Sequence, residues 1–458
     1  MAPAKSAEAP RVIVVGAGIA GLGAARRLVG RGVDVRVLER AGRPGGRATT
    51  EFAEGFALEA ASPLVSSADR ELLAWIDEVG VRDALLPLRP VVTVQVHRDR
   101  MTEIDPRGLR GIAKIPGLRR LHWLRLLRLP RLMKRYRPRL DIEEPGRAAP
   151  LDDRSLADFG RLYFGRSVVD HWMAPFVSAG LLADARETSR ALFVRRLHSH
   201  GEARWGLPRA TLGELTEAAA ARLPVLYGAD VDLVTEDQGG KLRVDYRMGE
   251  RERAIECDAV IVATDAGTAA RIAAPLVNRA ERDNLAAVCY APSIALGVAL
   301  RRPFELHPCC VCVPASEESP LDSVLLEPGV AGGRVPDGRG LATLRASGEW
   351  SRQAFELPAE SIEKDLLDAF ERFRPGARNA VLFTRLFRTP RAQPRFDVGR
   401  YRAIARFEQV HAGLCAEGRR LYFAGDYLLE PSWNGALLSG HRAARAAAAD
   451  LAAVARVR

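Results

Sequence analysis

The chain has 458 residues, of which 47% are hydrophobic and 27% are charged, and its formal net charge is +11 at pH 7. This composition is typical of a folded globular protein and excludes a disordered chain. The length predicts two or three domains. No stretch approaches the roughly 20 apolar residues of a membrane-spanning helix, and the first residues lack the apolar core of a signal peptide. We therefore expect a cytoplasmic protein, with peripheral attachment to the inner face of the membrane as an open alternative.

The positive charge is concentrated in one segment, residues 107–139, which argues against nucleic acid as a partner. The segment has twelve cations and no acid, more than the whole net charge. The cations are Arg107, Arg110, Lys114, Arg119, Arg120, Arg125, Arg128, Arg131, Lys134, Arg135, Arg137 and Arg139. Leucines lie among them, and arginine stems can surround apolar groups on an anionic membrane surface. No clean apolar helix face is evident and Pro130 should break a helix, so a solvated or partner-covering loop remains the alternative.

The first predicted elements form a βαβ unit. An apolar run at 11–15 predicts a buried strand, a helix follows up to Gly30, and residues 33–38 predict a second strand. A further helix should begin at Ser67 and end at Gly80. Two later helix starts have the capping-box form, in which a hydroxyl residue is followed three positions later by an acid. These pairs are Ser155 with Asp158 and Thr211 with Glu214.

Strands are predicted again later in the chain, interrupted by long helical and basic material at 107–210. The strands are 231–234, 241–246, 259–263, 293–300 and 421–424, and a helix is expected at 440–457. This order predicts an α/β fold with a discontinuous Rossmann-like dinucleotide domain and an inserted mixed α+β substrate domain that includes the helical part. The first domain should comprise 10–85, 215–290 and 415–458. The second should comprise 86–214 and 291–414.

The glycine motif after the first strand predicts a dinucleotide site. It reads Gly16-Ala17-Gly18-Ile19-Ala20-Gly21, and Glu39 ends the second strand. The first glycine permits the tight turn, the second lets the backbone approach a pyrophosphate, and the third lets the helix pack on the strand. The helix N-terminus then faces the negative charge, and the acid is placed to bind a ribose hydroxyl.

The residues after Glu39 favour FAD over NAD as the dinucleotide. Arg40 comes directly after Glu39, and the turn Gly45-Gly46-Arg47 begins five residues later. This turn offers unhindered backbone N–H groups and a guanidinium to a diphosphate.

Both ends of the chain resemble the superfamily of flavin amine oxidases, protoporphyrinogen oxidases and carotenoid desaturases. Arg43-Pro44-Gly45-Gly46-Arg47 matches one motif of that superfamily, and residues 423–440 resemble its C-terminal flavin motif. The resemblance implies that Gly425 and Asp426 bind the pyrophosphate or ribityl region of FAD. It places Gly435, with Trp433 and Ala436, at a helix N-terminus near the isoalloxazine, and Val231 on the adenine side.

Two stretches are similar to the protoporphyrinogen oxidase branch, namely 155–184 and Tyr290–Gly297. Amine oxidases of the superfamily place a lysine on the second of these, where this chain has Ala295. The departures are Glu59-Ala60-Ala61-Ser62-Pro63, where relatives usually read Glu-x-Gly-Pro, and a C-terminal motif closer to carotenoid desaturases and amine oxidase-like members.

The resemblance implies dehydrogenation of a lipophilic small molecule by hydride transfer to flavin N5, with protoporphyrinogen IX as substrate and oxygen as acceptor. A carotenoid or polyprenoid desaturase is the alternative. An amine oxidase, or a flavin-binding protein without turnover, ranks lower.

No other residues predict a catalytic or metal site. Cys309, Cys310 and Cys312 lack companions that would complete four ligands, so no metal is expected. His171 beside Trp172 is interpreted as a core or surface residue, and no Ser/His/Asp set is evident. The catalytic residues are left unassigned, because a flavin accepts hydride itself.

Overall fold

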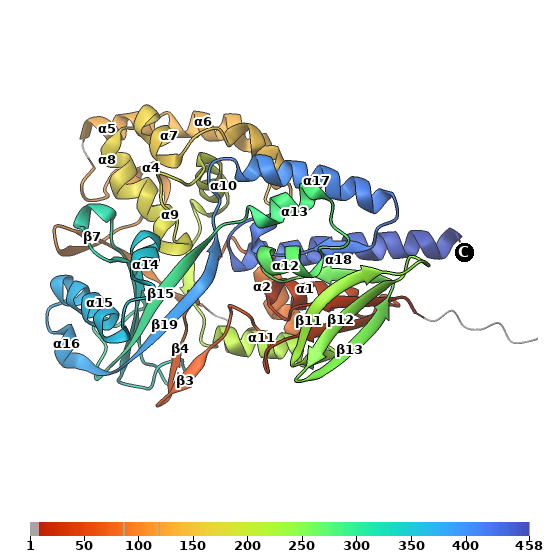
Figure 1. The fold of residues 1–458 in the computed structure, drawn as a ribbon. Helices are drawn as coiled ribbons and strands as arrows, with labels where there is room; N and C mark the ends of the chain where they lie inside the picture. Colours follow the sequence, from red (N-terminus) through yellow and green to blue (C-terminus); the bar gives the residue numbers. More distant parts are fainter. Residues whose placement is uncertain (1–8, 86–87, 119, 458) are drawn as a thin grey trace, which may run out of the picture. The chain divides into compact units, whose positions relative to one another are not determined.

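The computed structural model describes residues 9–85, 88–118 and 120–457, which form two compact units. Unit 1 consists of the chain up to Gly46, Thr216–Val288 and the chain from Arg406 onward. Unit 2 consists of Arg47–Leu215 and Cys289–Ala405 (Figure 1). The N-terminal residues on which the signal-peptide argument rests, and Arg119, lie outside the described residues.

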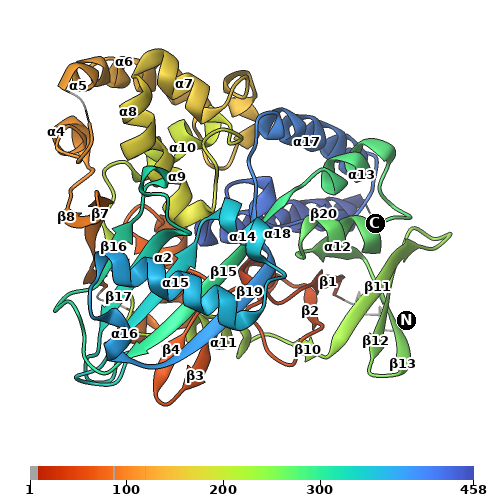
Figure 2. The ribbon, with the colours of Figure 1, turned by 60° about the vertical axis from the view of Figure 1, so that its left-hand side comes forward.

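Unit 1 is built around a parallel sheet of five strands in the order β10-β2-β1-β14-β20. Figure 2 labels β10, β2, β1 and β20 of this sheet. The strands are β1 Arg11–Val15, β2 Asp34–Glu39, β10 Val225–Tyr227, β14 Ala259–Val262 and β20 Leu421–Phe423. Val12 of the central strand pairs with Val35 on one side and with Ala259 on the other. Parallel strands that are buried on both faces need this continuous apolar composition. The predicted Rossmann-like α/β architecture is confirmed.

An antiparallel sheet and several helices complete unit 1. The sheet consists of β11 Ala229–Glu236, β12 Leu242–Met248 and β13 Arg251–Cys257. The helices are α1 Ile19–Leu28, α12 Ala266–Ile272, α13 Arg279–Ala286, the short η5 Asp426–Leu428 and α18 Trp433–Val457. Two helices cross the unit boundary, α11 Leu212–Ala220 and α17 Arg400–Ala416.

A buried carboxylate joins α13 to the end of α17 and the turn before β20. Glu281, which is fully buried, belongs to a capping box with Asn278. Its side chain also accepts hydrogen bonds from Arg419 and lies 3.0 Å from His411 Nδ1. Burial opposes ionisation, but the hydrogen bonds and charges of Arg419 and His411 outweigh it and lower the pKa of Glu281 to about 2.

We expect this carboxylate to make unfolding pH-dependent. Because the folded-state pKa lies below the ordinary value of 4.5, the stabilisation is complete above pH 4.5 and is lost as the pH falls toward 2. The difference corresponds to on the order of 3 kcal/mol. Denaturant unfolding from pH 6 to pH 2 should show a flatter decline for Glu281→Gln than for the parent. The same decline in both proteins would contradict the assignment.

Unit 2 contains a seven-stranded sheet in the order β19-β15-β18-β17-β16-β7-β8. The strands are β7 Val92–His97, β8 Arg100–Glu103, β15 Tyr290–Leu300, β16 Cys309–Cys312, β17 Leu321–Pro328, β18 Gly340–Ala346 and β19 Val381–Pro394. One face of the sheet carries valine and leucine side chains, and these pack against Leu366 and Phe370 of α15 Ala359–Phe373. The short helices α14 Gly348–Ala354 and α16 Ala377–Ala380 flank α15 in sequence.

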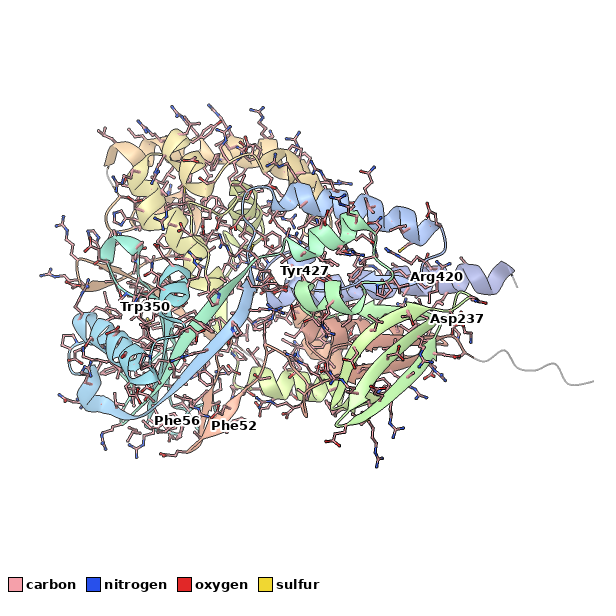
Figure 3. All side chains as sticks on the ribbon, viewed as in Figure 1. Phe52, Phe56, Asp237, Trp350, Arg420 and Tyr427 are labelled. Carbon is pink, nitrogen blue, oxygen red and sulfur yellow. The ribbon has the colours of Figure 1, made fainter. Side chains whose placement is uncertain are left out.

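Residues 47–85 belong to unit 2, whereas the sequence places the first segment of the dinucleotide domain at 10–85. The physical reason is strand pairing and ion pairing with partners far along the chain: Val65 pairs with Gly206, and Glu59 pairs with Arg334. The segment contains the hairpin β3 Glu51–Ala53 and β4 Phe56–Leu58, with Phe52 exposed and Phe56 buried (Figure 3). Its other elements are β5 Val65–Ser66, α2 Arg70–Val79 and α3 Arg82–Leu85.

Residues 107–210 are largely helical, as the sequence predicts. The helices share an apolar cluster. The elements are α4 Gly108–Ile112, α5 Arg120–Leu126, α6 Leu129–Tyr136, η1 Arg137–Arg139, η2 Pro145–Leu151, α7 Leu156–Tyr163, α8 Arg166–Val168, η3 Val169–Met173, α9 Ala174–Leu181 and α10 Arg190–His200. The short strands β6 Arg89–Pro90 and β9 Trp205–Leu207 join β5 in a small sheet. Among the described residues, no helix combines the length and apolarity needed to cross a bilayer.

Candidate dinucleotide site

The first and third motif glycines stand where no side chain fits. Gly16 has a φ of +102°, and a Cβ there would lie 2.9 Å from the carbonyl oxygen of Ala263. A Cβ on Gly21 would lie 1.9 Å from the carbonyl oxygen of Gly16. The tight turn and the close contact between helix and strand that the sequence predicts are therefore both present.

The middle glycine borders open space. A Cβ on Gly18 would come no closer than 3.9 Å to its nearest neighbour, the carbonyl oxygen of Gly45. Gly18 is also the N-cap of α1, whose first turn carries no acid and receives no side-chain cap. The backbone N–H groups of Ile19, Ala20 and Gly21 begin this helix. Such an uncapped, partly positive helix end with free space before it fits a pyrophosphate.

The Gly-Gly turn lies against the glycine motif. Gly45 donates a 2.8 Å hydrogen bond to the carbonyl of Ala17 and forms a bridge with Gly18. Gly46 has a φ of +59°, and a Cβ there would lie 3.6 Å from the Cα of Gly18. Two motifs that are separate in the sequence therefore form one backbone surface beside the start of α1.

Glu39 is buried at the end of β2, beside the same turn. Its carboxylate accepts hydrogen bonds from the backbone N–H groups of Ala17, at 2.7 Å, and Ala41, at 2.9 Å. These bonds hold the acid at the strand end, where a ribose is expected; each carboxylate oxygen has a second lone pair for a hydroxyl. Arg40 is exposed next to it.

The start of β11 reaches the same loop. Gly228 donates to the carbonyl of Ala41 at 3.3 Å, and Val231 is buried three residues further on. This places Val231 in the same unit as the ribose-side acid, as expected for an adenine contact. The contact itself stays a prediction.

The C-terminal motif also reaches the glycine motif. A Cβ on Gly440, in α18, would lie 2.0 Å from the carbonyl oxygen of Ala20, so α18 and α1 pack backbone to backbone. Gly425 donates to Ser439 Oγ at 3.0 Å, and the adjacent Asp426 is buried. Trp433, Gly435 and Ala436 form the first turn of α18, where Gly435 donates to Ser432 Oγ at 3.0 Å.

Arg47 is the one predicted cofactor residue that belongs to unit 2. Its Nη1 donates to the backbone carbonyl of Ala392 at 2.8 Å, on β19. A role toward the diphosphate therefore stays a prediction. The other predicted residues all lie in unit 1, and together they offer a buried acid, an uncapped helix end and open space, which fits FAD.

Side-chain sets that the sequence did not predict occur in unit 2. Ser199 Oγ lies 2.7 Å from His200 Nδ1, and His200 Nε2 lies 3.0 Å from Asp69 Oδ1. Ser199 stands in the last turn of α10, where carbonyl groups would disfavour a developing oxyanion, so this chain of groups is better suited to holding the helix end. Because Asp69 and His200 lie far apart in the sequence, no local pattern predicts their contact.

His171 contacts a second histidine. Its ring lies 5.4 Å from that of His97 in an edge-to-face arrangement. Burial lowers the pKa of His171, and the neighbouring His97 lowers it further. His171 is half-buried, which agrees with its interpretation as a core or surface residue. The described residues contain no group of three or more side chains arranged to hold a metal ion.

Comparisons with known proteins match this geometry. The family model described as flavin containing amine oxidoreductase matches residues 19–448. Protoporphyrinogen oxidase 2 of Arabidopsis thaliana is 26% identical over 174 residues, covering 38% of this chain and 33% of that protein. Phytoene dehydrogenase of Streptomyces griseus is 30% identical over 282 residues, covering 56% of this chain and 54% of that protein. The matches thus span between about a third and about half of these relatives.

Solved structures share the fold over nearly the whole chain. Cyclohexylamine oxidase from Brevibacterium oxydans superimposes with a TM-score of 0.73 at 17% identity, covering 97% of this chain and 99% of the other. The family match begins at Ile19, the first residue of α1, and covers most of the three segments that build unit 1. The chain therefore belongs to the flavin containing amine oxidoreductase family and is an FAD-dependent oxidoreductase.

Proposed function

We propose that the protein dehydrogenates a lipophilic small molecule, with protoporphyrinogen IX as the first candidate substrate and oxygen as the acceptor. The proposal rests on the absence of lysine from the strands of the seven-stranded sheet. The sequence has five lysines, at positions 5, 114, 134, 241 and 364, and none falls in a strand of the seven-stranded sheet. The position where amine oxidases of the superfamily carry a lysine is assigned to Ala295, which is buried in β15. The relatives that include a protoporphyrinogen oxidase support this choice.

A carotenoid or polyprenoid desaturase is the second candidate, supported by the match to a phytoene dehydrogenase. Amine oxidation ranks lower because of the missing lysine, although an amine oxidase shares the fold. A flavin-binding protein without turnover ranks lowest.

The roles of the chain's own residues follow from their positions. When bound, FAD supplies the hydride acceptor at N5. The start of α1 and the turn Gly45-Gly46 would hold the pyrophosphate, and Glu39 would hold the ribose. Asp426 and the first turn of α18 would position the ribityl and ring portions. No side chain is assigned to proton transfer.

Anaerobic titration of the purified holoprotein tests the proposal. The flavin absorption should bleach with protoporphyrinogen IX and recover on admission of oxygen. Phytoene and putrescine serve as the competing substrates. Bleaching by phytoene alone would favour the desaturase, bleaching by putrescine alone would favour an amine oxidase, and no bleaching by any substrate would contradict the proposed reaction.

We also infer that the segment 107–139 binds an anionic membrane surface, from which a lipophilic substrate could be taken. Leu121, Leu124 and Leu127 recur every third residue along α5 and just beyond it, and are 78%, 50% and 56% exposed. Arg125 and Arg128 are exposed among them. The sequence showed no clean apolar face because other leucines, such as Leu126, are buried in the helical cluster.

The helix is interrupted next to Pro130, as expected: α5 ends at Leu126, a turn follows at 127–128, and α6 begins at Leu129 with the proline in its first turn. Exposed leucines surrounded by cations are the arrangement that an anionic interface accepts. The side chains of Arg119 and Arg120 lie outside the described residues.

Liposome flotation tests this inference. Replacing Arg125, Arg128 and Arg131 by glutamine should weaken binding to anionic liposomes by several-fold or more, because each cation near such a surface contributes about 1 kcal/mol. Binding of the parent should weaken as salt rises, since the attraction is screened within roughly 8 Å at physiological ionic strength. Glutamines at the exposed Arg251, Arg253 and Arg302 provide the matched control. Equal binding by both triple variants would contradict the inference.

A further inference from the structure

Strand pairing aligns a row of polar side chains across the sheet of unit 2. Gln95 on β7 pairs with Cys312 on β16, which pairs with Ser323 on β17. Ser323 pairs with Arg345 on β18, and Arg345 pairs with Ala295 on β15. Paired residues point to the same face of a sheet, so these five residues, called the polar row below, form one line across five neighbouring strands.

The opposite face is a closed apolar core. The alternate residues Val94, Val311, Val324, Leu344 and Leu296 are all buried, and they belong to the cluster that contains α15. In an antiparallel sheet with one such face, the other face is commonly solvated. Here it is not, because Gln95 is 1% exposed and Ser323 is 6% exposed. Gln95 and Ser323 are therefore covered by the protein, whereas Cys312 and Arg345 are half-buried.

Arg345 is the cation of this row, and no acid neutralises it by direct contact. Its Nε is buried and makes no hydrogen bond, and no carboxylate oxygen of a described residue lies within 4.0 Å of its guanidinium. The side chain as a whole is half-buried, so part of it remains accessible. A partly buried guanidinium without a carboxylate partner is unfavourable, and an anion that reaches it would remove part of the cost.

Two further buried polar atoms in these strands have no hydrogen-bond partner among the described residues. The amide Nε2 of Gln95 is buried without an acceptor. Asp322 is the extra residue of a bulge in β17; its Oδ1 accepts from Ser323 Oγ at 2.6 Å, and its Oδ2 has no partner. Burial raises the pKa of Asp322 to about 7, which limits its ability to neutralise Arg345.

Two hydrogen-bonded thiols lie on this face. Cys310 lies two residues before Cys312 on β16 and faces the same side. A hydrogen bond from Cys312 lowers the pKa of the Cys310 thiol, and the charge of Arg345 lowers it further. The same hydrogen bond and burial raise the pKa of Cys312, so Arg345 is the cation of this face that lacks a carboxylate partner among the described residues.

We propose that the accessible part of the Arg345 guanidinium, in the middle of the polar row, binds the carboxylate of a small molecule. The inference rests on the proposed function in that the molecule would be the substrate of this oxidoreductase, which would then be an amphipathic acid. A porphyrinogen carries carboxylate side chains and a hydrocarbon carotenoid carries none. The polar row therefore favours the first candidate substrate over the second.

Ligand binding by the holoprotein tests the proposal without turnover. Octanoate, octanamide and octylamine share one alkyl chain and differ in charge, and isothermal titration calorimetry measures each affinity. We expect octanoate to bind at least about tenfold more tightly than octanamide, the ratio that one charge-assisted hydrogen bond supplies. Octylamine should bind more weakly than octanamide. Equal binding of octanoate and octanamide would overturn the proposal.

Variants test whether the polar row causes the preference for octanoate over octanamide. Arg345→Gln should abolish the preference for octanoate while FAD content stays unchanged, and Arg345→Lys should retain part of it. Arg385→Gln is the matched control, because Arg385 lies on β19 of the same sheet and is exposed in an ion pair with Glu51. Its preference should match that of the parent. A preference that survives Arg345→Gln would overturn the assignment.

Further results distinguish failure of the carboxylate site from failure of the proposed function. Arg345→Met, which removes the charge and keeps a side chain of similar length, should also abolish the preference for octanoate, and it decides the matter if Arg345→Gln does not fold. Octanoate binding that depends on Arg345 would stand even if no substrate bleaches the flavin. Turnover of protoporphyrinogen IX without any preference for octanoate would leave the proposed function intact and remove this inference.

Discussion

The Gly18→Val protein is expected to fold but to purify without FAD. In the structure the space before Gly18 is open, and a Cβ there meets nothing closer than the Gly45 carbonyl oxygen at 3.9 Å. Valine would place two methyl groups where the pyrophosphate meets the backbone of α1. Several charge-assisted hydrogen bonds of about 1.5–3 kcal/mol each depend on that approach, so affinity should fall by more than about a thousandfold.

The ratio of flavin absorption to protein absorption measures the effect, and circular dichroism checks the fold. Gly413→Val is the control, since Gly413 is exposed in α17 with no atom within 4 Å of an added Cβ. It should retain FAD. Normal FAD content in Gly18→Val would refute the placement of the pyrophosphate.

The Arg334→Met protein is expected to lose about 3–5 kcal/mol of stability. Arg334 bridges two carboxylates, with Nη2 2.7 Å from Glu59 and Nε 3.0 Å from Glu327, and all three side chains are 1% exposed. Removing the guanidinium leaves two acids facing each other in the interior of unit 2. The melting temperature should fall by about 10 °C.

A matched exposed pair shows whether burial causes the effect. Arg385 and Glu51 form an ion pair in the same unit with half-exposed side chains, and Arg385→Met should cost no more than about 1 kcal/mol. Adding Glu327→Gln to Arg334→Met should recover part of the loss, because one buried charge is then removed. Similar melting temperatures for the two arginine variants would show that the buried set contributes little.

Local chemistry made much of unit 1 predictable from the sequence. The glycine motif, the first two strands and the apolar strand at 259 follow from rules that act within a few residues. The helix predicted to end at Gly80 does so with that glycine in a left-handed conformation. Both predicted hydroxyl caps form, and Thr211 with Glu214 makes the full reciprocal box.

Features that depend on distant partners were not predictable in the same way. The last helix begins at Trp433 and not at 440, because Ser432 and the packing of Gly440 on α1 stabilise an earlier start. The strand β19 extends over Val381–Pro394 despite its arginines, because it pairs with β15 along its length. The partners of Arg334 and of the polar row are brought together only by the register of the sheet.

The discontinuity of unit 1 has a consequence for biosynthesis. The strands β1 and β2 leave the ribosome early, yet β14, the second neighbour of β1, ends at Val262 and β20 ends at Phe423. At 5–20 residues per second, β14 follows β2 after roughly 11 to 45 seconds. Throughout that delay one edge of an apolar strand lacks its partner, a state prone to aggregation and suited to chaperone binding. Because α1 also packs on α18, FAD capture becomes a late event that follows synthesis of the C-terminal helix.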